Sequence, residues 1–251
     1  MTSTKDAVYV YGIVPADVQV EDDAKGIAGA PVELIREGDV AALVSPIKTD
    51  HAIGKPEDLQ VHAELLDGTA SVAPVLPLRF GAVMTDTKSV AEELLREHHD
   101  DFAEALKALE GHAEYVIKGR YDQKEFLIGL LEENDQARAL RDDIQAKPEE
   151  AARNSRMALG ELIANTVEAK RQADTQTVVG QLSDIATQVN VREPTSEWDA
   201  VHVALLAEVD RERDVQAFVD ELNEKGEGQI QLRLLGPLAP YDFVVAPAPG
   251  S

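Results

Sequence analysis

The arginine within the stretch PLRFGAV, residues 77–83, is the residue whose setting most suggests chemistry. It interrupts an apolar run that begins at Val72. In a strand, Arg79 faces the opposite side of the sheet from Leu78 and Phe80. A guanidinium there could fork onto a carboxylate or onto strand-end carbonyls, bind an acidic group of a ligand or partner, or take part in catalysis. We favour the first interpretation, a structural fork.

Histidines are the next candidates for chemistry. Only His98 and His99 cluster, and Asp100 and Asp101 follow them directly. Adjacent residues of a helix point about 100° apart, so at most one imidazole and one acid a turn away could share a metal. A solvated helix face is the simpler interpretation, and we predict no metal site. His202 alternates within an apolar strand, where we expect a structural histidine with satisfied ring nitrogens.

Motifs of the common catalytic and nucleotide-binding sites do not occur in the sequence. It contains no G-x-S-x-G, no H-E-x-x-H, no Walker loop and no G-x-G-x-x-G. The acids beside the turn Gly226-Glu227-Gly228 oppose phosphate binding, and Ser45 and Ser71 lack a neighbouring histidine that could activate them. We therefore predict no catalytic residue, no cofactor, and a protein that is not an enzyme.

The charge of the chain narrows its possible partners. Its 251 residues include 47 acidic and 24 basic residues, which give a formal net charge of −23. Such a surface repels nucleic acid and anionic lipid, so neither is an expected partner. The acidity serves solubility or a salty cytosol, or it meets a partner with a complementary basic or apolar face. Both explanations stay open, and they are compatible.

The remaining bulk properties predict a cytosolic protein with a substantial core. The chain is 44% apolar, yet no stretch approaches the roughly 18 apolar residues of a membrane span. Its N-terminus lacks the features of a signal peptide. The absence of cysteine excludes disulfides and thiolate metal sites and fits a reducing compartment.

The first part of the chain reads as mixed strands and helices. Apolar periodicity and turn residues predict strands at 7–14, 32–36, 40–45, 71–84 and 113–122, and helices at 56–68 and 86–110. The strands at 32–36 and 40–45 enclose Glu37-Gly38-Asp39 and form a hairpin. In the strand at 71–84, Pro74 and Pro77 are confined to an edge, a bulge or the strand entrance. We expect the helices to lie on one side of the resulting sheet.

The middle of the chain is predicted to be helical and its last part mixed again. Residues 124–189 read as helix with a break near Lys147-Pro148, and the apolar stripe reaches Val189. Because a helix of that length projects from a compact body unless it pairs or bends, we favour a helical hairpin or a kinked helix. A strand at 198–210, a helix at 213–226 and a strand at 229–237 follow.

This order of elements predicts an α+β fold of two small domains. Each has a ferredoxin-like antiparallel sheet, and a long helical segment lies in the middle of the chain. The predicted domains are an N-terminal α+β domain at 1–112 and a C-terminal α+β domain at 113–251. The second contains the helical insertion at about 124–189.

Four stretches, in order, resemble motifs of the gas vesicle protein F/L family (GvpF/GvpL). They are YVYGIV (9–14), GIAGAPVELIREGDVAALVS (26–45), VLPLRFGAVM (75–84) and GPLAPYDF (236–243). The third runs proline, leucine, arginine, phenylalanine, glycine, as it tends to do in such proteins. In the fourth, Leu238 and Ala239 stand where the family often has an aromatic residue and a proline. That departure weakens the match of the fourth motif but does not affect the matches of the other three motifs.

The resemblance implies an accessory or structural protein of gas vesicle formation, located in the cytoplasm and associated with gas vesicles. Its implied partners are the small apolar gas vesicle shell protein, bound during nucleation or assembly, and other gas vesicle accessory proteins. Within the matching motifs, the candidate partner-binding or structural residues are Arg79, Phe80, Tyr9, Tyr11 and Tyr241.

Two hypotheses of different class follow for the function. A shell subunit exposes strand edges and apolar helix faces, so an assembly factor would engage it through edge strands of the N-terminal sheet or through the long helix. The alternative is a small-molecule-binding regulator, because pairs of ferredoxin-like domains often bind metabolites. That alternative predicts a closed pocket around Arg79 and a thermal shift on ligand binding.

Overall fold

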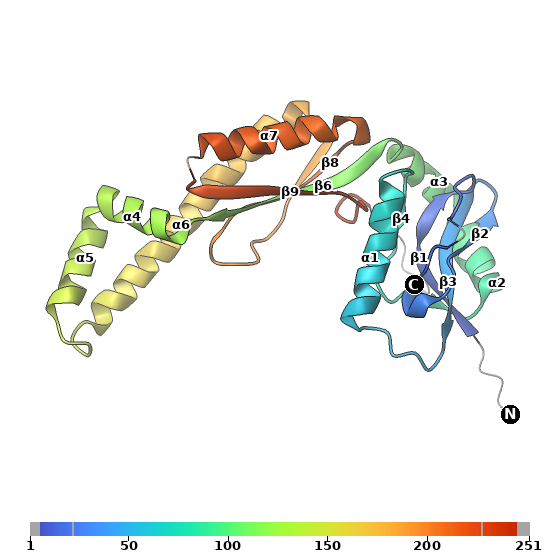
Figure 1. Cartoon of the computed structure of the whole chain (residues 1–251), viewed down its shortest axis with the longest axis horizontal. Helices are drawn as coiled ribbons and strands as arrows, with labels where there is room; N and C mark the ends of the chain where they lie inside the picture. Colours follow the sequence, from blue (N-terminus) through green and yellow to red (C-terminus); the bar gives the residue numbers. More distant parts are fainter. Residues whose placement is uncertain (1–5, 22, 227, 245–251) are drawn as a thin grey trace. The chain divides into compact units, whose positions relative to one another are not determined.

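The computed structural model describes residues 6–21, 23–226 and 228–244. Two compact units make up the chain, and their elements are drawn in Figure 1. The first unit contains the described residues of Met1–Tyr115, Leu206–Glu212 and Gly236–Ser251, and the second contains Val116–Leu205 and Arg213–Leu235. The C-terminal segment therefore belongs to the first unit, which the predicted domain ranges 1–112 and 113–251 do not anticipate.

The sheet of the first unit is antiparallel, in the order β2-β3-β1-β4, with β5 also paired to β1. The predicted hairpin is present, with Gly38 at a positive φ in its turn. The strands are β1 (Asp6–Pro15), β2 (Glu33–Glu37), β3 (Val40–Lys48), β4 (Leu76–Pro77) and β5 (Val83–Met84).

The predicted single strand at 71–84 is wrong. The segment forms two strands of two residues each, β4 and β5, and both pair with β1. Prolines 74 and 77 explain the interruption, because a proline has no N–H to donate to a ladder and is confined to strand edges or ends. Arg79 and Phe80 consequently lie in the connection between β4 and β5.

A bulge in β1 determines which face each of its residues joins. The register with β3 shifts between Val10 and Gly12, so Tyr11 is the extra residue. Val10 and Ile13 enter the core on one face, whereas Tyr11 and Val14 enter the core on the other. Without the bulge, a period of two would put Tyr11 and Ile13 on the same face.

Helices cover both faces of this sheet, which corrects the expectation of helices on one side (Figure 1). On one face, α1 (Pro56–Ala70) packs through Leu66 and Ala70. On the other face, the π-helical segment η2 (Val90–Arg96) and α3 (His99–Ala108) pack through side chains such as Leu94 and Phe102. The short helix α2 (Thr87–Ser89) precedes η2, so the predicted helix at 86–110 is present with a π-helical stretch inside it. Two buried faces explain why β1 and β3 are apolar almost throughout.

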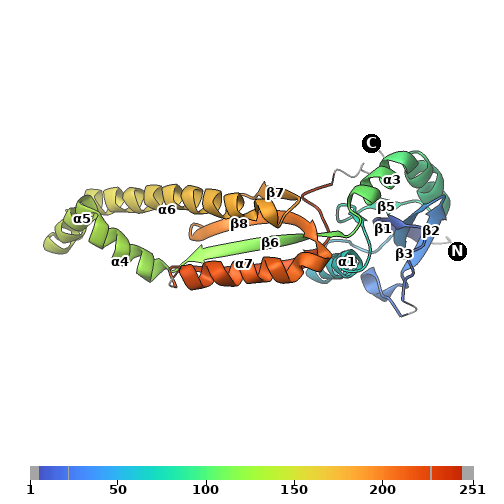
Figure 2. The ribbon, with the colours of Figure 1, turned by 90° about the horizontal axis from the view of Figure 1, so that it is seen from above.

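The second sheet has the order β7-β8-β6-β9. Its strands are β6 (His112–Tyr121), β7 (Gln188–Val191), β8 (Asp199–Glu208) and β9 (Ile230–Leu238). The helix α7 (Glu212–Lys225) runs along this sheet and buries Val215 and Val219 (Figure 2).

The helical middle of the chain is a hairpin, one of the two predicted forms. It consists of α4 (Gln123–Glu133), α5 (Asp135–Ala146) and α6 (Arg153–Gln181), and α5 packs on α6 (Figure 2). Helix does not reach Val189, because residues 188–191 pair with β8 as β7. No helix of the described ranges combines the length and the apolarity needed to cross a membrane. The predicted α+β class, with antiparallel sheets and a long helical segment, is confirmed.

Candidate functional site

Four of the five candidate residues meet around a histidine in the first unit. Alternation along β1 points Tyr9 and Tyr11 to the face that α1 covers, and α1 contributes His62. The ring centroid of His62 lies 5.7 Å from that of Tyr9, 5.8 Å from that of Tyr11 and 5.6 Å from that of Phe80. Tyr241 joins from the C-terminal segment through a hydrogen bond to His62. We call these five residues the His62 cluster.

A chain of hydrogen bonds runs through the cluster. The backbone N–H of Gly81 donates to Tyr9 Oη over 3.0 Å, and Tyr9 Oη lies 3.0 Å from His62 Nδ1. On the other side of the ring, His62 Nε2 lies 2.8 Å from Tyr241 Oη. Because Tyr9 Oη already accepts from Gly81, its own proton can be donated to Nδ1, which leaves Nε2 to carry the imidazole proton and donate to Tyr241. The chain thus suits a neutral histidine.

Tyr11 is held by a separate pair of hydrogen bonds. Its hydroxyl lies 2.8 Å from Ser45 Oγ on β3 and accepts the backbone N–H of Ile27 over 2.7 Å. Ile27 begins the 3₁₀ turn η1 (Ile27–Gly29), so this bond attaches the long connection between β1 and β2 to the sheet. A buried tyrosine needs a partner for its hydroxyl, and here that requirement fixes a loop.

Burial sets the proton affinities of the cluster. It lowers the pKa of His62 to about 4 and raises the pKa of Tyr9 to about 12. Burial also raises the pKa of Tyr241, and the negative charge of Asp67 adds to that rise. These pKa values all lie away from neutrality, so none of the three groups is suited to exchange protons at pH 7 as a general acid or base. The chemistry of the cluster is hydrogen bonding and aromatic packing.

The C-terminal segment is anchored on the first unit beside the cluster. Ala239 is buried, and its N–H donates to Asp67 Oδ1 over 2.9 Å. Further along, the N–H of Asp242 donates to Glu114 Oε2 over 3.0 Å. Tyr241, between them, remains 40% exposed. The fourth motif, GPLAPYDF (236–243), therefore lies in the same unit as the first motif, YVYGIV (9–14).

Among the five candidate residues, Arg79 makes no polar contact with the His62 cluster. Its side chain is exposed and makes no hydrogen bond or ion pair within the described part of the chain. The expected fork onto a carboxylate or onto carbonyls is therefore wrong for this arrangement. Because Arg79 is exposed, it also does not lie in the closed pocket that the small-molecule alternative predicts.

His62 is the site residue that the motifs did not single out. Its signal in the sequence is weak: it lies four residues after Asp58 and four before Leu66, on the buried face of α1. That spacing indicates that the imidazole faces the core, but not which hydroxyls meet it. Tyr9, Phe80 and Tyr241 come from distant parts of the chain, so only the tertiary fold reveals the cluster.

The other histidines that the sequence raised have structural surroundings. His99 pairs with Asp39 over 2.6 Å and with Asp100 over 3.1 Å, and no described group of three or more ligating side chains could hold a metal ion. His202 lies with Nδ1 2.9 Å from the carbonyl oxygen of Glu193, so Nδ1–H donates there. This hydrogen bond fits the predicted structural histidine at 202, which stays a prediction.

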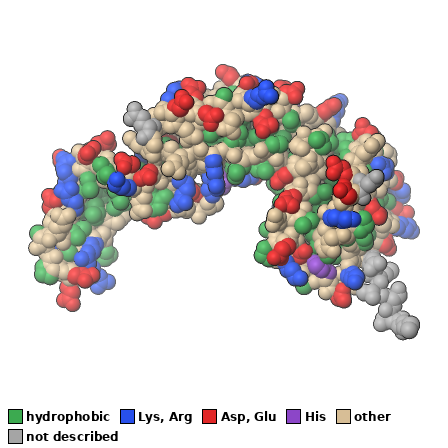
Figure 3. All heavy atoms as spheres, in the orientation of Figure 1, with side chains coloured by type: hydrophobic (Ala, Val, Ile, Leu, Met, Phe, Trp, Pro, Cys, Tyr) green, Lys and Arg blue, Asp and Glu red, His purple; other side chains and the backbone are tan. Residues whose placement is uncertain are grey.

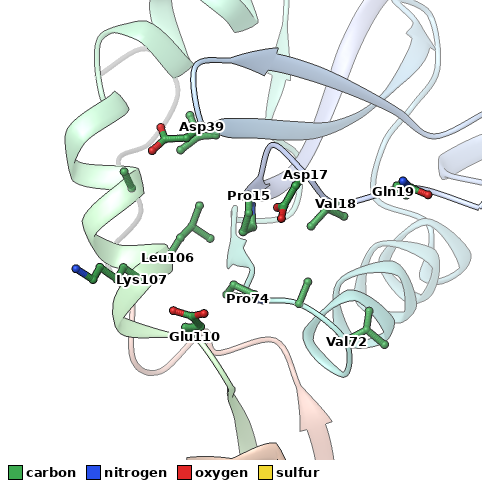
Figure 4. Close-up of a pocket in the computed structure, with 13 residues that line it drawn as sticks. Pro15, Asp17, Val18, Gln19, Asp39, Val72, Pro74, Leu106, Lys107 and Glu110 are labelled. Carbon is green, nitrogen blue, oxygen red and sulfur yellow. The ribbon is translucent and has the colours of Figure 1, made fainter.

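A groove of about 560 Å³ opens at one end of the first unit (Figure 4). One wall is α3, with Ala103 and Leu106, and the opposite wall is the loop at 72–74 after α1. Pro15 and Val40, from an end of β1 and an end of β3, also line the groove. Val72 is 84% exposed at its edge. We call this feature the α3 groove.

The polar lining of the α3 groove is mainly acidic. Asp17 lies between the two walls, with Asp39 toward one end and Glu110 toward the other (Figure 4). Asp39 pairs with His99, whereas Asp17 and Glu110 form no ion pair within the described residues. Lys107 is the one basic lining residue, and it extends from α3 away from Asp17.

Comparisons with known proteins agree on one family. The model of the family described as gas vesicle synthesis protein GvpL/GvpF matches residues 7–245. Gas vesicle protein F of Streptomyces sp. (strain CB03234) is 30% identical over 95% of this chain and 99% of its own length. Gas vesicle protein L of the same strain is 29% identical over 96% and 94%. The crystal structure of GvpF from Anabaena sp. PCC7120 is 22% identical, covers 95% of this chain and 98% of its own, and superposes with a TM-score of 0.77.

Proposed function

The chain belongs to the GvpL/GvpF family of gas vesicle synthesis proteins, and on that basis we propose that it binds the small apolar gas vesicle shell protein during nucleation or assembly. The role is that of an accessory or structural protein without catalytic activity, working in the cytoplasm at the gas vesicle. Other gas vesicle accessory proteins are its further proposed partners. The observation that carries the proposal is the family match over residues 7–245.

The chemistry of the first unit supports a binding role. The polar groups at the centre of the His62 cluster are paired with one another, and burial moves their pKa values away from neutrality. Such an arrangement supports rigidity, because each hydrogen bond joins segments that are distant in the sequence. A rigid framework is what a surface needs in order to hold one partner in one orientation.

The distribution of charge supports the handling of an apolar partner. Acidic side chains are spread over the visible face of both units, among apolar ones (Figure 3). A net charge of −23 keeps copies of the chain apart and in solution. Exposed apolar residues such as Val72 and Met157 can then contact an apolar client, while the surrounding carboxylates oppose self-association.

The proposal is tested by measuring whether the whole chain binds the shell protein of the same host, presented as a soluble fusion. Saturable binding that the fusion carrier alone does not show is the expected result. A chain that stays monodisperse and folded but does not bind the fusion contradicts the proposal.

A further inference from the structure

We infer that the α3 groove is the surface that receives the shell protein, through a segment in which apolar side chains stand next to a lysine or arginine. This inference rests on the proposed function and names the site and the chemistry of the contact. It assigns the contact to the end of the first sheet, and not to the strand edges or to α6. Those two were the surfaces that the sequence suggested.

The lining of the groove is apolar at its base and along one edge. Val72 is 84% exposed, although valine gains free energy by leaving water, and it stands opposite the side chains of α3 (Figure 4). Leu106 and Val40 are buried behind the surface, and Pro15 and Pro74 are half-buried, so the groove has an apolar base. Its volume of about 560 Å³ lies within the roughly 300–1,000 Å³ of sites that enclose small ligands or a few side chains.

The rigidity of the lining makes it suitable for docking. Pro15 ends β1, Val40 begins β3, and Leu106 belongs to the core cluster between α3 and the sheet. The turn that carries Asp17 is closed by the N–H of Val18, which donates to the carbonyl of Pro15 over 3.2 Å. A partner that enters such a preformed site loses less free energy in ordering it.

The charged side chains of the lining favour a basic occupant. Three carboxylates line the groove, two of them without an ion partner among described residues, against a single lysine that extends away from Asp17. A segment that placed its own acid here would be repelled by these carboxylates, although the guanidinium of Arg36, which donates to the carbonyls of Ala16 and Val18, offsets part of their charge. A lysine or arginine beside the apolar contact would instead pair with Asp17 or Glu110, which favours this occupant over an acidic or a purely apolar one.

Two sets of variants separate the apolar contact from the charged one. Val72→Asp places a charge on the apolar edge, and the matched control Met157→Asp makes the same change at another exposed apolar residue, in α6. The double variant Asp17→Asn with Glu110→Gln removes the two lining carboxylates that have no ion partner among the described residues. Its control, Asp101→Asn with Glu104→Gln, removes two charges from exposed positions of α3 that do not line the groove. Because Val72 and both acids are exposed, we expect every variant to fold.

Binding to the shell fusion is measured for the whole chain and each variant, at low and at high salt. We expect Val72→Asp to weaken binding roughly tenfold or more, because the partner would have to desolvate a charge in place of an exposed apolar side chain. The charge variant should weaken it several-fold at low salt and should reduce the salt dependence of the affinity, because screened pairs contribute little at high salt. Both controls should bind as the wild type does.

Three outcomes would overturn the inference. If the wild type binds the fusion and the groove variants bind equally well, the groove is not the site, although the proposed function stands. If the folded wild type does not bind at all, the proposed function fails and the inference fails with it. If sedimentation shows a dimer of the chain alone that Val72→Asp dissociates, the groove receives a second copy of this chain.

Discussion

At the residue scale, Arg79 stands apart from the other candidate residues because its guanidinium is exposed and contacts no described polar group. We expect Arg79→Ala to change the free energy of unfolding by no more than about 0.5 kcal/mol, as for exposed positions in general. Urea unfolding checks this. Tyr9→Phe is the control, and it should cost more, because it removes the hydroxyl that joins Gly81 to His62.

The result for Arg79→Ala also decides what the residue does. A folded variant that binds the shell fusion more weakly would make Arg79 a partner contact. If the variant does not fold, Arg79 has the structural role that the sequence suggested. That result would contradict the description of its side chain as exposed and unpaired.

A second prediction for a single residue concerns His62 and the way in which the free energy of unfolding depends on pH. Its pKa is about 4 in the folded chain, below the ordinary value of 6.5, so the unfolded state binds the proton more readily between these values. Stability is therefore fully present above about pH 6.5 and falls as the pH drops toward 4. The slope from this one group approaches about 1.4 kcal/mol per pH unit.

Comparison with His62→Gln isolates that contribution. Urea unfolding of both proteins at pH 7, 6 and 5 should show a shallower loss of stability in the variant, because glutamine does not titrate. The carboxylates of the chain contribute to both curves and cancel in the difference. Parallel curves would show that His62 is not held neutral by burial.

At the element scale, the sequence predicted the regular elements well, because each carries its own signal. The aromatic and β-branched residues of β1 and the glycine turn between β2 and β3 are local patterns, and so is Pro56 at the start of α1. The connection through Arg79 was misjudged because its apolar composition resembles a strand, whereas the two prolines limit the ladder to short pieces. The bulge at Tyr11 and the bonds around His62 arise from contacts between distant segments, which no local pattern contains.

The bulge yields a prediction at this scale. A Cβ on Gly12 would lie 2.7 Å from the backbone oxygen of Leu76 and 2.9 Å from Cδ2 of Leu66, so the paired strand and α1 would both have to shift. We expect Gly12→Ala to lower the free energy of unfolding by about 1–3 kcal/mol, the range for overpacked sites. Thermal or urea unfolding gives the value.

Gly68 offers a matched control in the exposed part of α1. A Cβ there meets nothing within 4 Å, so Gly68→Ala should raise stability by roughly 0.5–1 kcal/mol through better helix propensity. If Gly12→Ala did not lower the free energy of unfolding, β4 and α1 would not approach Gly12 as closely as described.

At the scale of the whole molecule, the chain does not divide at one point along the sequence. Residues 206–212 and 236–244 lie in the first unit, and Tyr241 completes the hydrogen-bond chain through His62. A fragment that ended near residue 112 would lack Tyr241 and the buried Ala239. Binding experiments should therefore use the full chain, with point variants in place of halves.

The function of the whole molecule could be approached from the sequence only through resemblance. Charge and composition exclude classes of partner, and the sequence contains none of the common catalytic motifs, but neither property leads to gas vesicles. The four motifs did so by their resemblance to the family, and the fold assembles all four in one unit. The α3 groove had no such motif, since its lining comes from four separated segments, 15–19, 39–40, 72–74 and 103–110.

The proposed function and its site in the α3 groove are tested most directly by equilibrium binding between the whole chain and a soluble fusion of the host's shell protein. We expect saturable binding that the carrier alone does not compete for, and that weakens with Val72→Asp but not with Met157→Asp. No binding by a folded, monodisperse chain, at low and at high salt, would contradict the proposed function.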